Sequence, residues 1–255
     1  MQEPERQQMS FFDRQRAVGG NTQSVSMNKL SLLLLAFCGA LVGCVSAADK
    51  ADDSGWVNLF NGKDLDGWVQ HGGKAKYRFE DGQLIGTCVS NTPNSFLCSS
   101  RDYTNFILEV DFKTPTGLNS GVQIRSHVYD KPTEFEWKGE KKKIPADRVH
   151  GLQVEIDPSD RAWSGGIYEE GRRGWLNDLK ANEQARKAYK KEEWNHYRIE
   201  AKGDSIKTWI NGVPAADLKD SLAMSGIIAF QVHGVGKRAE VLEVRFRNAR
   251  LKELP

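Results

Sequence analysis

Short segments of alternating apolar and polar residues, separated by turn residues, dominate the chain from Trp56 onward. The segments 106–112 and 242–246 each place an apolar side chain at every second position. This period of two is that of a β-strand with one buried face, whereas a helix repeats every three to four residues. The segment 206–210 runs directly into Asn211-Gly212, the strongest short hairpin signal. The pattern therefore predicts an all-β fold built from many short antiparallel strands.

Two segments depart from this pattern. Residues 175–194 have a modest amphipathic character, and we expect one short helix among them. Residues 129–150 are charged and include Pro132 and Pro145, which predicts a long loop over the concave face of a sheet. No repeat and no Pro-rich or Ser-rich linker divides the region, and a hydrophobic fraction of 39% suffices for one sizeable core. We therefore expect a single β-sandwich domain over residues 54–255.

The N-terminal part has the features of an export signal. Met27-Asn28-Lys29 precedes an apolar run over 30–42, which is too short to span a bilayer comfortably. The run leads to Cys44 in a sequence that resembles the lipobox of bacterial lipoproteins, which predicts lipidation of Cys44. The following Val45-Ser46-Ala47-Ala48 offers an alternative cleavage site that would give a secreted protein.

These features divide the N-terminal part in two. We interpret residues 27–47 as a lipoprotein-type signal peptide, and residues 1–26 as a disordered extension or a misassigned start. The expected product is an exported bacterial protein. Its expected location is the periplasm, or the outer membrane or cell surface through a lipid anchor.

Two cysteines, Cys88 and Cys98, remain after the signal. They flank the turn-like segment 91–95 symmetrically, so in a hairpin they would face each other on one side of the ladder. An exported protein can form a disulfide between such residues, and two buried thiols are the alternative.

Composition argues against several partners. The formal net charge is +2, and neither basic cluster, Lys141 to Lys143 or Lys187 to Lys191, is interleaved with exposed aromatic residues. Nucleic-acid binding is therefore not expected, and membrane contact is expected only through the lipid anchor. The histidines stand at positions 71, 127, 150, 196 and 233 without an H-x-x-x-H pair, so we expect no cofactor. A structural calcium held by loop oxygens would leave no signature in this sequence.

Polar side chains share one parity on three predicted strands. In each of the segments 120–126, 151–157 and 228–233, apolar residues occupy one parity and amide, carboxylate, guanidinium or imidazole groups the other. The polar positions are Gln123, Arg125, Gln153, Glu155, Asp157, Gln231 and His233. We predict that they share one concave face and form a polar cleft. A mostly solvated antiparallel sheet would show the same alternation and is the alternative.

Several longer motifs occur in a fixed order along the chain. They are VNLFNGKDLDGW at 57–68, SGVQIRS at 120–126, GLQVEID at 151–157, SGGIYEEGRRGWL at 164–176, EEWNHYRI at 192–199, and the closing FQVHG and FRNARLKEL. In this order they resemble the 3-keto-disaccharide hydrolase family of the concanavalin-like lectin and glucanase superfamily. The resemblance covers nearly all of the predicted domain. It implies a two-sheet antiparallel jelly roll with a sugar lying across the concave sheet.

The resemblance also implies a reaction. A glycoside oxidised at C3 has an acidic hydrogen at C2, so a general base can remove it and expel the C1 substituent before water completes net hydrolysis. Glu155, Asp157 or His233 would be the base, and Arg125 or Gln123 would donate to the enolate oxygen. The positions expected to bind the sugar are Gln123, Gln153, Tyr168, Glu169, Trp175 and Gln231.

Two other functions fit the same residues. An ordinary glycoside hydrolase would use Glu155 and Asp157 as paired carboxylates, although Pro158 is expected to end the strand beside them. A non-catalytic lectin-like module would instead stack sugars on aromatic platforms. Those platforms would be Trp163, Tyr168 and Trp175. The density of ionisable groups in the predicted cleft favours an enzyme.

Overall fold

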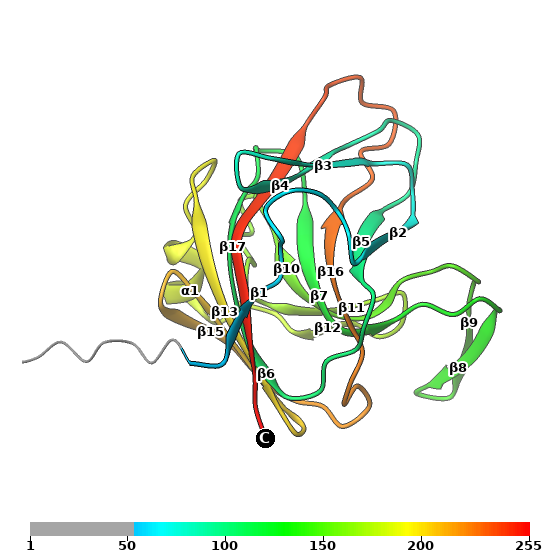
Figure 1. Cartoon of the computed structure of the whole chain (residues 1–255). Coiled ribbons are helices and arrows are strands. Elements are labelled where there is room, and N and C mark those ends of the chain that lie inside the picture. Colours follow the sequence, from blue (N-terminus) through cyan, green and yellow to red (C-terminus); the bar gives the residue numbers. More distant parts are fainter. Residues whose placement is uncertain (1–53) are drawn as a thin grey trace, which may run out of the picture. The chain divides into compact units, whose positions relative to one another are not determined.

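The computed structural model describes residues 54–255, and the predicted signal peptide with Cys44 lies outside them. Within the described residues the chain forms many short strands and one short helix (Figure 1). None of the described helical residues belongs to a helix long and apolar enough to cross a membrane. The all-β prediction is confirmed.

Two large antiparallel sheets make up the domain. The first, named here the scaffold sheet, has eight strands in the order β15-β14-β13-β6-β17-β4-β3, with β1 paired to β17. Its strands are β1 (Trp56–Asn58), β3 (Lys76–Glu80), β4 (Gln83–Thr87), β6 (Phe106–Lys113), β13 (Asn195–Lys202), β14 (Ser205–Ile210), β15 (Val213–Lys219) and β17 (Glu243–Glu253). The predicted hairpin at Asn211-Gly212 joins β14 to β15.

The second sheet, named the cleft sheet, has seven strands in the order β12-β11-β10-β7-β16-β5-β2. Its strands are β2 (Trp68–Gly72), β5 (Ser95–Ser99), β7 (Ser120–His127), β10 (His150–Ile156), β11 (Ile167–Glu170), β12 (Gly174–Asn177) and β16 (Ile227–Val232). The strands of this sheet come from segments between residues 68 and 232, so the fold brings together elements that are far apart in the sequence.

The hydrophobic core lies between the two sheets. Strand β6 of the scaffold sheet buries every second residue, as the sequence pattern predicts. Phe230 of the cleft sheet contacts Phe246 of the scaffold sheet, with ring centroids 4.7 Å apart. Burial of such rings and of the aliphatic residues around them is the main favourable term in folding. The predicted two-sheet sandwich is confirmed.

One row of residues crosses the outer face of the cleft sheet from edge to edge. Directly paired residues of neighbouring antiparallel strands lie on the same face of a sheet. The row consists of Val69, Cys98, Ala229, Gln123, Gln153, Tyr168 and Trp175. Glu155 stands two residues after Gln153 on the same strand and therefore faces the same way. The row is apolar at the β2 edge, and polar and aromatic toward the β12 edge.

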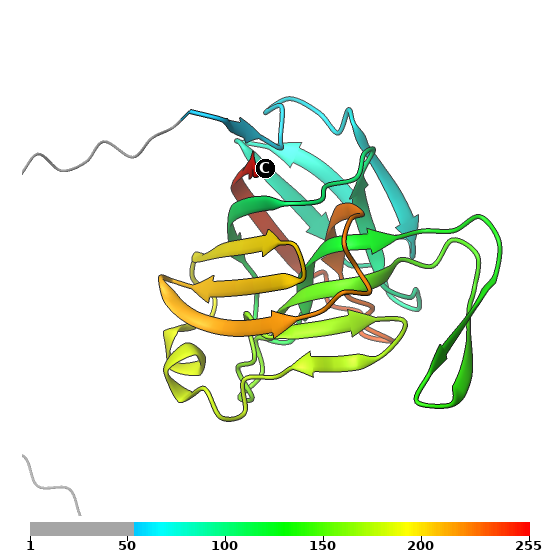
Figure 2. The same cartoon turned by 90° about the horizontal axis from the view of Figure 1, so that it is seen from below.

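The irregular segment 129–150 contains a hairpin that the sequence analysis did not anticipate. Its strands are β8 (Thr133–Trp137) and β9 (Glu140–Ile144), which form a separate two-stranded sheet (Figure 2). The rings of Phe135 and Trp137 each lie 5.1 Å from a guanidinium carbon, that of Arg172 and that of Arg173, in the turn between β11 and β12. Glu134 stands opposite Lys143, and Glu136 opposite Lys141, so each pair can be stabilised by opposite charges.

The single expected helix is confirmed as α1 (Glu183–Ala188). It begins after Asn182, whose side-chain oxygen accepts a hydrogen bond from the backbone NH of Ala185 at 3.1 Å. The earlier part of the amphipathic segment is strand instead, because Trp175 of β12 pairs with Tyr168 of β11.

The expectation that Cys88 and Cys98 face each other across a hairpin is wrong. Cys88 follows β4 of the scaffold sheet, whereas Cys98 lies on β5 of the cleft sheet. The chain crosses from one sheet to the other between them. Both cysteines are buried free thiols, as in the alternative interpretation.

A β-bulge in β7 changes the direction of Arg125. Opposite both β10 and β16, two residues of β7 face a single residue of the partner strand. Arg125 adopts a φ of +45° there. Beyond the bulge the parity is reversed, so Ser126 rather than Arg125 shares a face with Gln123 and donates to its Oε1 at 2.7 Å.

The side chain of Arg125 is fully buried on the other side. Its guanidinium donates to the carbonyl oxygens of Thr104 and Gly203 at 2.7 Å each, and to that of Ala223 at 3.2 Å. The prediction that Arg125 shares a face with Glu155 is therefore wrong, and Arg125 serves to satisfy loop carbonyls at the edge of the sandwich.

Replacing Arg125 should affect stability rather than chemistry. Arg125→Met leaves three carbonyl oxygens without their donor, and we expect the free energy of unfolding to fall by about 3 kcal/mol. Urea unfolding measures this loss. Arg101→Met is the matched control, because the side chain of Arg101 is exposed and forms a surface ion pair with Glu253 beside the ring of Tyr103, so its loss should change stability by less than about 1 kcal/mol. A stable Arg125→Met protein without activity would contradict this assignment.

Candidate active site

A polar hollow of about 290 Å³ opens on the outer face of the cleft sheet. Strands β10, β11 and β12 supply one side of it, and the end of β16 with the segments before β5 and β7 supplies the other. The residues that line this polar hollow are Asn94, Asn119, Gln153, Glu155, Arg161, Tyr168, Glu170, Trp175, Gln231 and His233. The structure thus brings together six of the positions singled out in the sequence: Gln153, Glu155, Tyr168, Trp175, Gln231 and His233.

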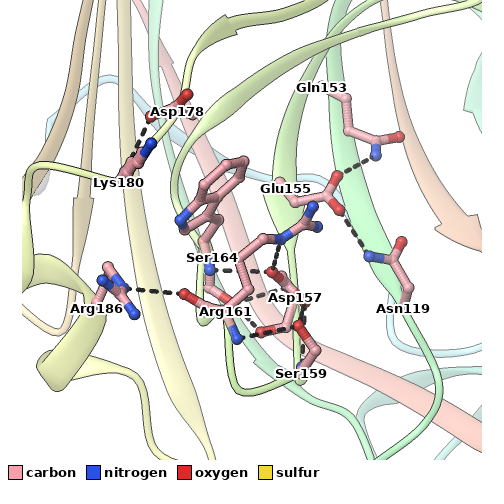
Figure 3. Close-up of polar contacts among 11 residues, drawn as sticks. Asn119, Gln153, Glu155, Asp157, Ser159, Arg161, Ser164, Asp178, Lys180 and Arg186 are labelled. Atoms are coloured by element: carbon pink, nitrogen blue, oxygen red, sulfur yellow. Dashed lines mark hydrogen bonds and ion pairs between the residues drawn. The ribbon is translucent and has the colours of Figure 1, made fainter.

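Glu155 is the buried carboxylate of this polar hollow, with 5% of the residue exposed. Its Oε1 accepts a hydrogen bond from Nδ2 of Asn119 at 2.6 Å, and its Oε2 accepts one from Nε2 of Gln153 at 2.7 Å (Figure 3). Burial raises the pKa of Glu155 to about 7, although the two amide donors act in the opposite direction. A carboxyl group with this pKa can gain or lose a proton near neutral pH.

A chain of side-chain hydrogen bonds leads to Glu155 from the bulge. The hydroxyl of Ser126 donates to Oε1 of Gln123, and Nε2 of Gln123 donates to Oε1 of Gln153 at 2.6 Å. Gln153 in turn donates to Glu155, so every link is oriented toward the carboxylate. Gln123 therefore acts behind the polar hollow and does not line it.

Gly121 leaves the space that Gln153 occupies. A Cβ atom on Gly121 would lie 2.4 Å from Cδ of Gln153, closer than real Cβ contacts allow. Gly121 is the direct strand partner of Glu155, so the close approach lies beside the carboxylate. The glycine in the SGVQIRS motif is thus explained by the side chain that packs over it.

Asp157 lies outside the polar hollow, although its parity in the sequence predicted a shared cleft face. Its Oδ1 accepts from the hydroxyl of Ser159 at 2.6 Å, and its Oδ2 accepts from Nε of Arg161 at 2.7 Å and from the backbone NH of Trp163 at 3.1 Å. Burial acts to raise the pKa of Asp157, but these donors hold it below its usual range. β10 ends at Ile156, and Asp157 organises the turn that follows.

Arg161 lines the polar hollow and was missed in the sequence, because it lies in an irregular segment without strand parity. Its guanidinium carbon lies 4.5 Å from the ring centroid of Trp163 and 5.2 Å from that of Trp175. Its Nε is bonded to Asp157, whereas its two terminal nitrogens have no hydrogen-bond partner among the described residues. The guanidinium is thus fixed through its Nε, and its two terminal nitrogens can donate hydrogen bonds to a ligand.

Two further groups of the polar hollow lie on β16 and at its end. The side-chain amide of Gln231 is fully buried, and neither its Nε2 nor its Oε1 has a partner within residues 54–255. Nδ1 of His233 lies 2.8 Å from the carbonyl oxygen of Gly234 and donates to it in the neutral ring, which leaves Nε2 as an acceptor. An unsatisfied buried amide is costly unless a water or a ligand completes it.

Comparison with known sequences identifies the family. Residues 55–252, well over half of the chain, match the family described as 3-keto-alpha-glucoside-1,2-lyase-like domain. The chain belongs to this family. Among curated proteins, none matches the sequence of this lyase-like domain.

Solved structures share the fold of the lyase-like domain. A protein described as a candidate glycosyl hydrolase from Parabacteroides distasonis is 20% identical, with 79% of this chain and 94% of that chain covered and a TM-score of 0.50. A carbohydrate-binding module from Bacillus subtilis is 16% identical over 73% of this chain and 96% of its own, also with a TM-score of 0.50. A galectin-like protein of unknown function from Bacillus subtilis is 13% identical over 74% and 90%, with the same score.

These likenesses confirm the jelly-roll type of sandwich. The family and the fold together make this lyase-like domain a carbohydrate-active or carbohydrate-binding protein. The substrate and the reaction must be inferred from the residues that line the polar hollow.

Glu169 does not line the polar hollow of the lyase-like domain, although it was expected among the residues that contact the sugar. Its carboxylate is fully buried and accepts from Arg172, from two guanidinium nitrogens of Arg173 and from the backbone NH of Arg173. Tyr168 and Glu170 have the opposite parity on β11 and line the hollow instead. The alternation of β11 thus points to Glu170, a lining residue that is not among the site residues predicted from the sequence.

Glu170 is the second carboxyl group of the polar hollow and is 6% exposed. Burial raises its pKa, although the ion pair with Arg148 acts against this. Within residues 54–255, no group of three or more histidine, cysteine, aspartate or glutamate side chains is arranged to hold a metal ion.

The raised pKa of Glu155 makes a testable contribution to stability. Between the unfolded pKa of 4.5 and the folded pKa of about 7, the folded state holds a proton that the unfolded state has released. Stability should therefore fall as the pH rises through this window, by on the order of 3 kcal/mol from this group. Glu155→Gln removes the titration and fits the same space if the Asn119 amide turns over.

Urea unfolding of the wild type and of Glu155→Gln at pH 5 and pH 8 measures this contribution. The stability of the variant relative to the wild type should increase at the higher pH. Glu136→Gln on the exposed β8 strand is the control and should show no such change. A difference between Glu155→Gln and the wild type that is the same at both pH values would contradict the raised pKa.

Proposed function

We propose that the protein cleaves glycosides oxidised at C3, by removing the C2 hydrogen, eliminating the C1 substituent and adding water to the product. The observation that carries this proposal is the buried Glu155 carboxylate, with a pKa of about 7, in a hollow that is also lined by amide, aromatic and cationic groups and by the second carboxyl group, Glu170. Membership of the lyase-like family supports the same substrate class.

The chemistry needs one base and stabilisation of one oxygen. The base takes the C2 proton, and the electron pair of that bond forms an enolate with the C3 carbonyl. The enolate then expels the C1 oxygen, which leaves as an alcohol once it gains a proton. Water adds to C1 of the resulting enone and C2 regains a proton, so the net change is hydrolysis. Enzymes accelerate such steps by matching the pKa of the base to the working pH.

Glu155 fits the role of base. Half of its population is ionised at a pH equal to its pKa of about 7, so the basic form is available while the group remains a stronger base than an exposed glutamate. The hydrogen bonds from Asn119 and Gln153 fix the orientation of both oxygens. Preorganised geometry of this kind lowers the entropy cost of proton transfer.

We assign to Arg161 the role that the sequence predicted for Arg125, which is to donate a hydrogen bond to the enolate oxygen. Its terminal nitrogens face the same polar hollow as Glu155 and can donate to an oxygen on which negative charge develops. Gln231 has a free amide NH₂ in the same hollow and is the second donor. Gln231 is held by burial, and Arg161 by its ion pair with Asp157 and its contact with the ring of Trp163, so little reorganisation accompanies the reaction.

The proton for the leaving group comes from the other side of the polar hollow. Glu170 lines it from β11, and burial favours the protonated form of this carboxyl group. His233 lines it from the end of β16, and its Nε2 is the alternative base. Tyr168 and Trp175, with ring centroids 5.4 Å apart, offer the sugar an aromatic surface between them.

Two alternatives remain outcomes of the test. A two-carboxylate hydrolase would pair Glu155 with Glu170, because Asp157 is occupied by the turn it organises. A binding module is favoured by the Tyr168 and Trp175 surface. Such a module would bind sugars without converting them.

Removal of the base should abolish most of the activity on a keto-glycoside. Glu155→Gln should slow the cleavage of a 3-keto-glucoside by about 10²- to 10⁴-fold, while sugar binding changes much less. In the wild type, kcat/KM should fall as the pH drops below about 7, because the basic form of Glu155 is lost. His233→Asn tests the alternative base, and Glu134→Gln on the exposed hairpin is the inert control. A larger loss in His233→Asn than in Glu155→Gln would transfer the role to the histidine.

Deuterium at C2 of the substrate separates the mechanisms. Elimination should give a primary isotope effect or release the label into solvent, followed by NMR of the product. Full retention of the label, with cleavage of the unoxidised glucoside at a similar rate, would instead support the two-carboxylate hydrolase. Turnover of neither substrate would support the binding module.

The N-terminal sequence supports export as a lipoprotein anchored at Cys44. We expect the mature chain to begin at Cys44 with attached lipid when it is expressed in a bacterial host. Mass spectrometry of membrane-extracted protein measures this directly. An unmodified N-terminus at Ala48 or Asp49 would contradict lipidation and leave secretion.

A further inference from the structure

A strained residue stands at the far end of the hydrogen bonds that lead to Glu155. Arg125 has a φ of +45° in the bulge of β7, which is unfavourable for a residue other than glycine. Strain of this kind persists only where the surrounding structure holds it, and it often serves a function. On the outer face, the bulge gives Ser126 the place beside Gln123 that a regular strand would give to Arg125.

Two glycines make room for Ser126 in this position. A Cβ atom on Gly151 of β10 would lie 2.6 Å from Oγ of Ser126, and one on Gly226, just before β16, would lie 2.5 Å from its carbonyl oxygen. Both glycines also have a φ that other residues rarely adopt, +136° and +151°. The chain on either side of β7 is thus shaped around Ser126, which is fully buried.

We infer that Ser126 and Gln123 are positioning residues, which hold the amide of Gln153 in the orientation that donates to the Glu155 carboxylate. Neither residue lines the polar hollow, so both act on the base without touching the substrate. The inference rests on the proposed function for its effect on the reaction rate, whereas its effect on the carboxylate can be measured without turnover.

The orientation of the Gln153 amide depends on its partners rather than on its shape. The oxygen and the NH₂ group of an amide are similar in size, so both orientations fit the space above Gly121. With Nε2 toward Glu155, the amide stabilises the carboxylate. With Oε1 there, it could only accept a hydrogen bond from the protonated group. Gln123 selects the first orientation, because its Nε2 donates to Oε1 of Gln153 at 2.6 Å.

Ser126 orients Gln123 in the same way. Its hydroxyl donates to Oε1 of Gln123 at 2.7 Å, whereas the carbonyl oxygens of Ile124 and Leu152 lie farther away, at 3.1 and 3.3 Å. An ionised acceptor at the end of such a chain polarises every donor in it, so each bond strengthens the next. Loss of either residue should therefore destabilise the ionised form of Glu155 more than the protonated form.

The other ionisable groups around the carboxylate stand outside this chain of hydrogen bonds. They come from the end of β10 and the turn after it, from β11 and from the end of β16, and they are Asp157, Arg161, Tyr168, Glu170 and His233. Among the described residues, none of them is hydrogen-bonded or ion-paired to Ser126 or Gln123. A change at either position leaves these charges in place, so a shift of the Glu155 pKa reports on the chain itself.

Titration of Glu155 in two variants tests the inference. Gln123→Met leaves Oε1 of Gln153 without its donor, and we expect the pKa of Glu155 to rise by about one pH unit, the difference between a charge-assisted and a neutral hydrogen bond. Ser126→Ala acts one hydrogen bond farther away and should raise this pKa by less. Carbon-13 NMR of the labelled Glu155 side chain measures both midpoints.

Ser99→Ala is the matched control. Ser99 is a buried serine of β5 in the same sheet, and its hydroxyl donates to the carbonyl oxygen of Arg101 at 2.8 Å and accepts from the backbone NH of Ile228 at 3.1 Å. Its loss should lower stability as the loss of the Ser126 hydroxyl does, without moving the titration midpoint. An unchanged midpoint in Gln123→Met or in Ser126→Ala, or an equal shift in Ser99→Ala, would overturn the inference.

Kinetics connect the positioning residues to the reaction. A rise of one pH unit lowers the ionised fraction of Glu155 at pH 7 from about one half to about one tenth. For Gln123→Met, kcat/KM on a 3-keto-glucoside should therefore fall about fivefold at pH 7 and recover at pH 9. An equal loss at both pH values would contradict the inference, because a distorted hollow does not recover with pH. Shifted midpoints in a protein that cleaves no keto-glycoside would refute the proposed function and support the positioning role.

Discussion

The burial of the Glu155 carboxylate is the constraint on which the rest of the site depends. A charge removed from water must be compensated by donors or must bind a proton, and this protein does both in part. The amides of Asn119 and Gln153 supply hydrogen-bond donors. They compensate only part of the desolvation penalty, and the remainder raises the pKa of Glu155. The backbone around Glu155 is fixed as well, since its NH donates to Gly166 and its carbonyl accepts from Gly165 at 2.9 Å each. The hydroxyl of Tyr197, from the scaffold sheet, donates to the same carbonyl.

The two outer faces of the sandwich show why alternation alone does not identify a site. On the scaffold sheet, Glu109 pairs with Arg198 and Arg250 at 2.8 Å, and both arginine side chains are more than one-third exposed. Exposed ion pairs of this kind contribute little and need no ligand. On the cleft sheet the corresponding outward-facing positions are Gln123 and Gln153, which are buried and hydrogen-bonded to each other. Burial of neutral amides, rather than their spacing, distinguishes the two faces.

The sequence was sufficient where strands are regular and insufficient where they are not. Parity placed Gln153, Glu155 and Gln231 correctly, because each lies within an undistorted part of its strand. It failed at Arg125, since a bulge adds one residue to β7 and reverses the face. It also failed at Asp157, because β10 ends one residue earlier and the chain turns. The loop residues Asn119 and Arg161 have no period, so only the folded chain brings them to Glu155.

The titration of Glu155 in the folded protein tests the account most directly. The side-chain carboxyl carbon of Glu155 can be followed by carbon-13 NMR in selectively labelled protein, with Glu155→Gln to assign the signal. The account predicts a midpoint at about pH 7, because the carboxyl group is buried beneath two neutral donors. A midpoint near 4.5, the ordinary value for glutamate, would mean that water reaches the group freely and would contradict its role as the buried base.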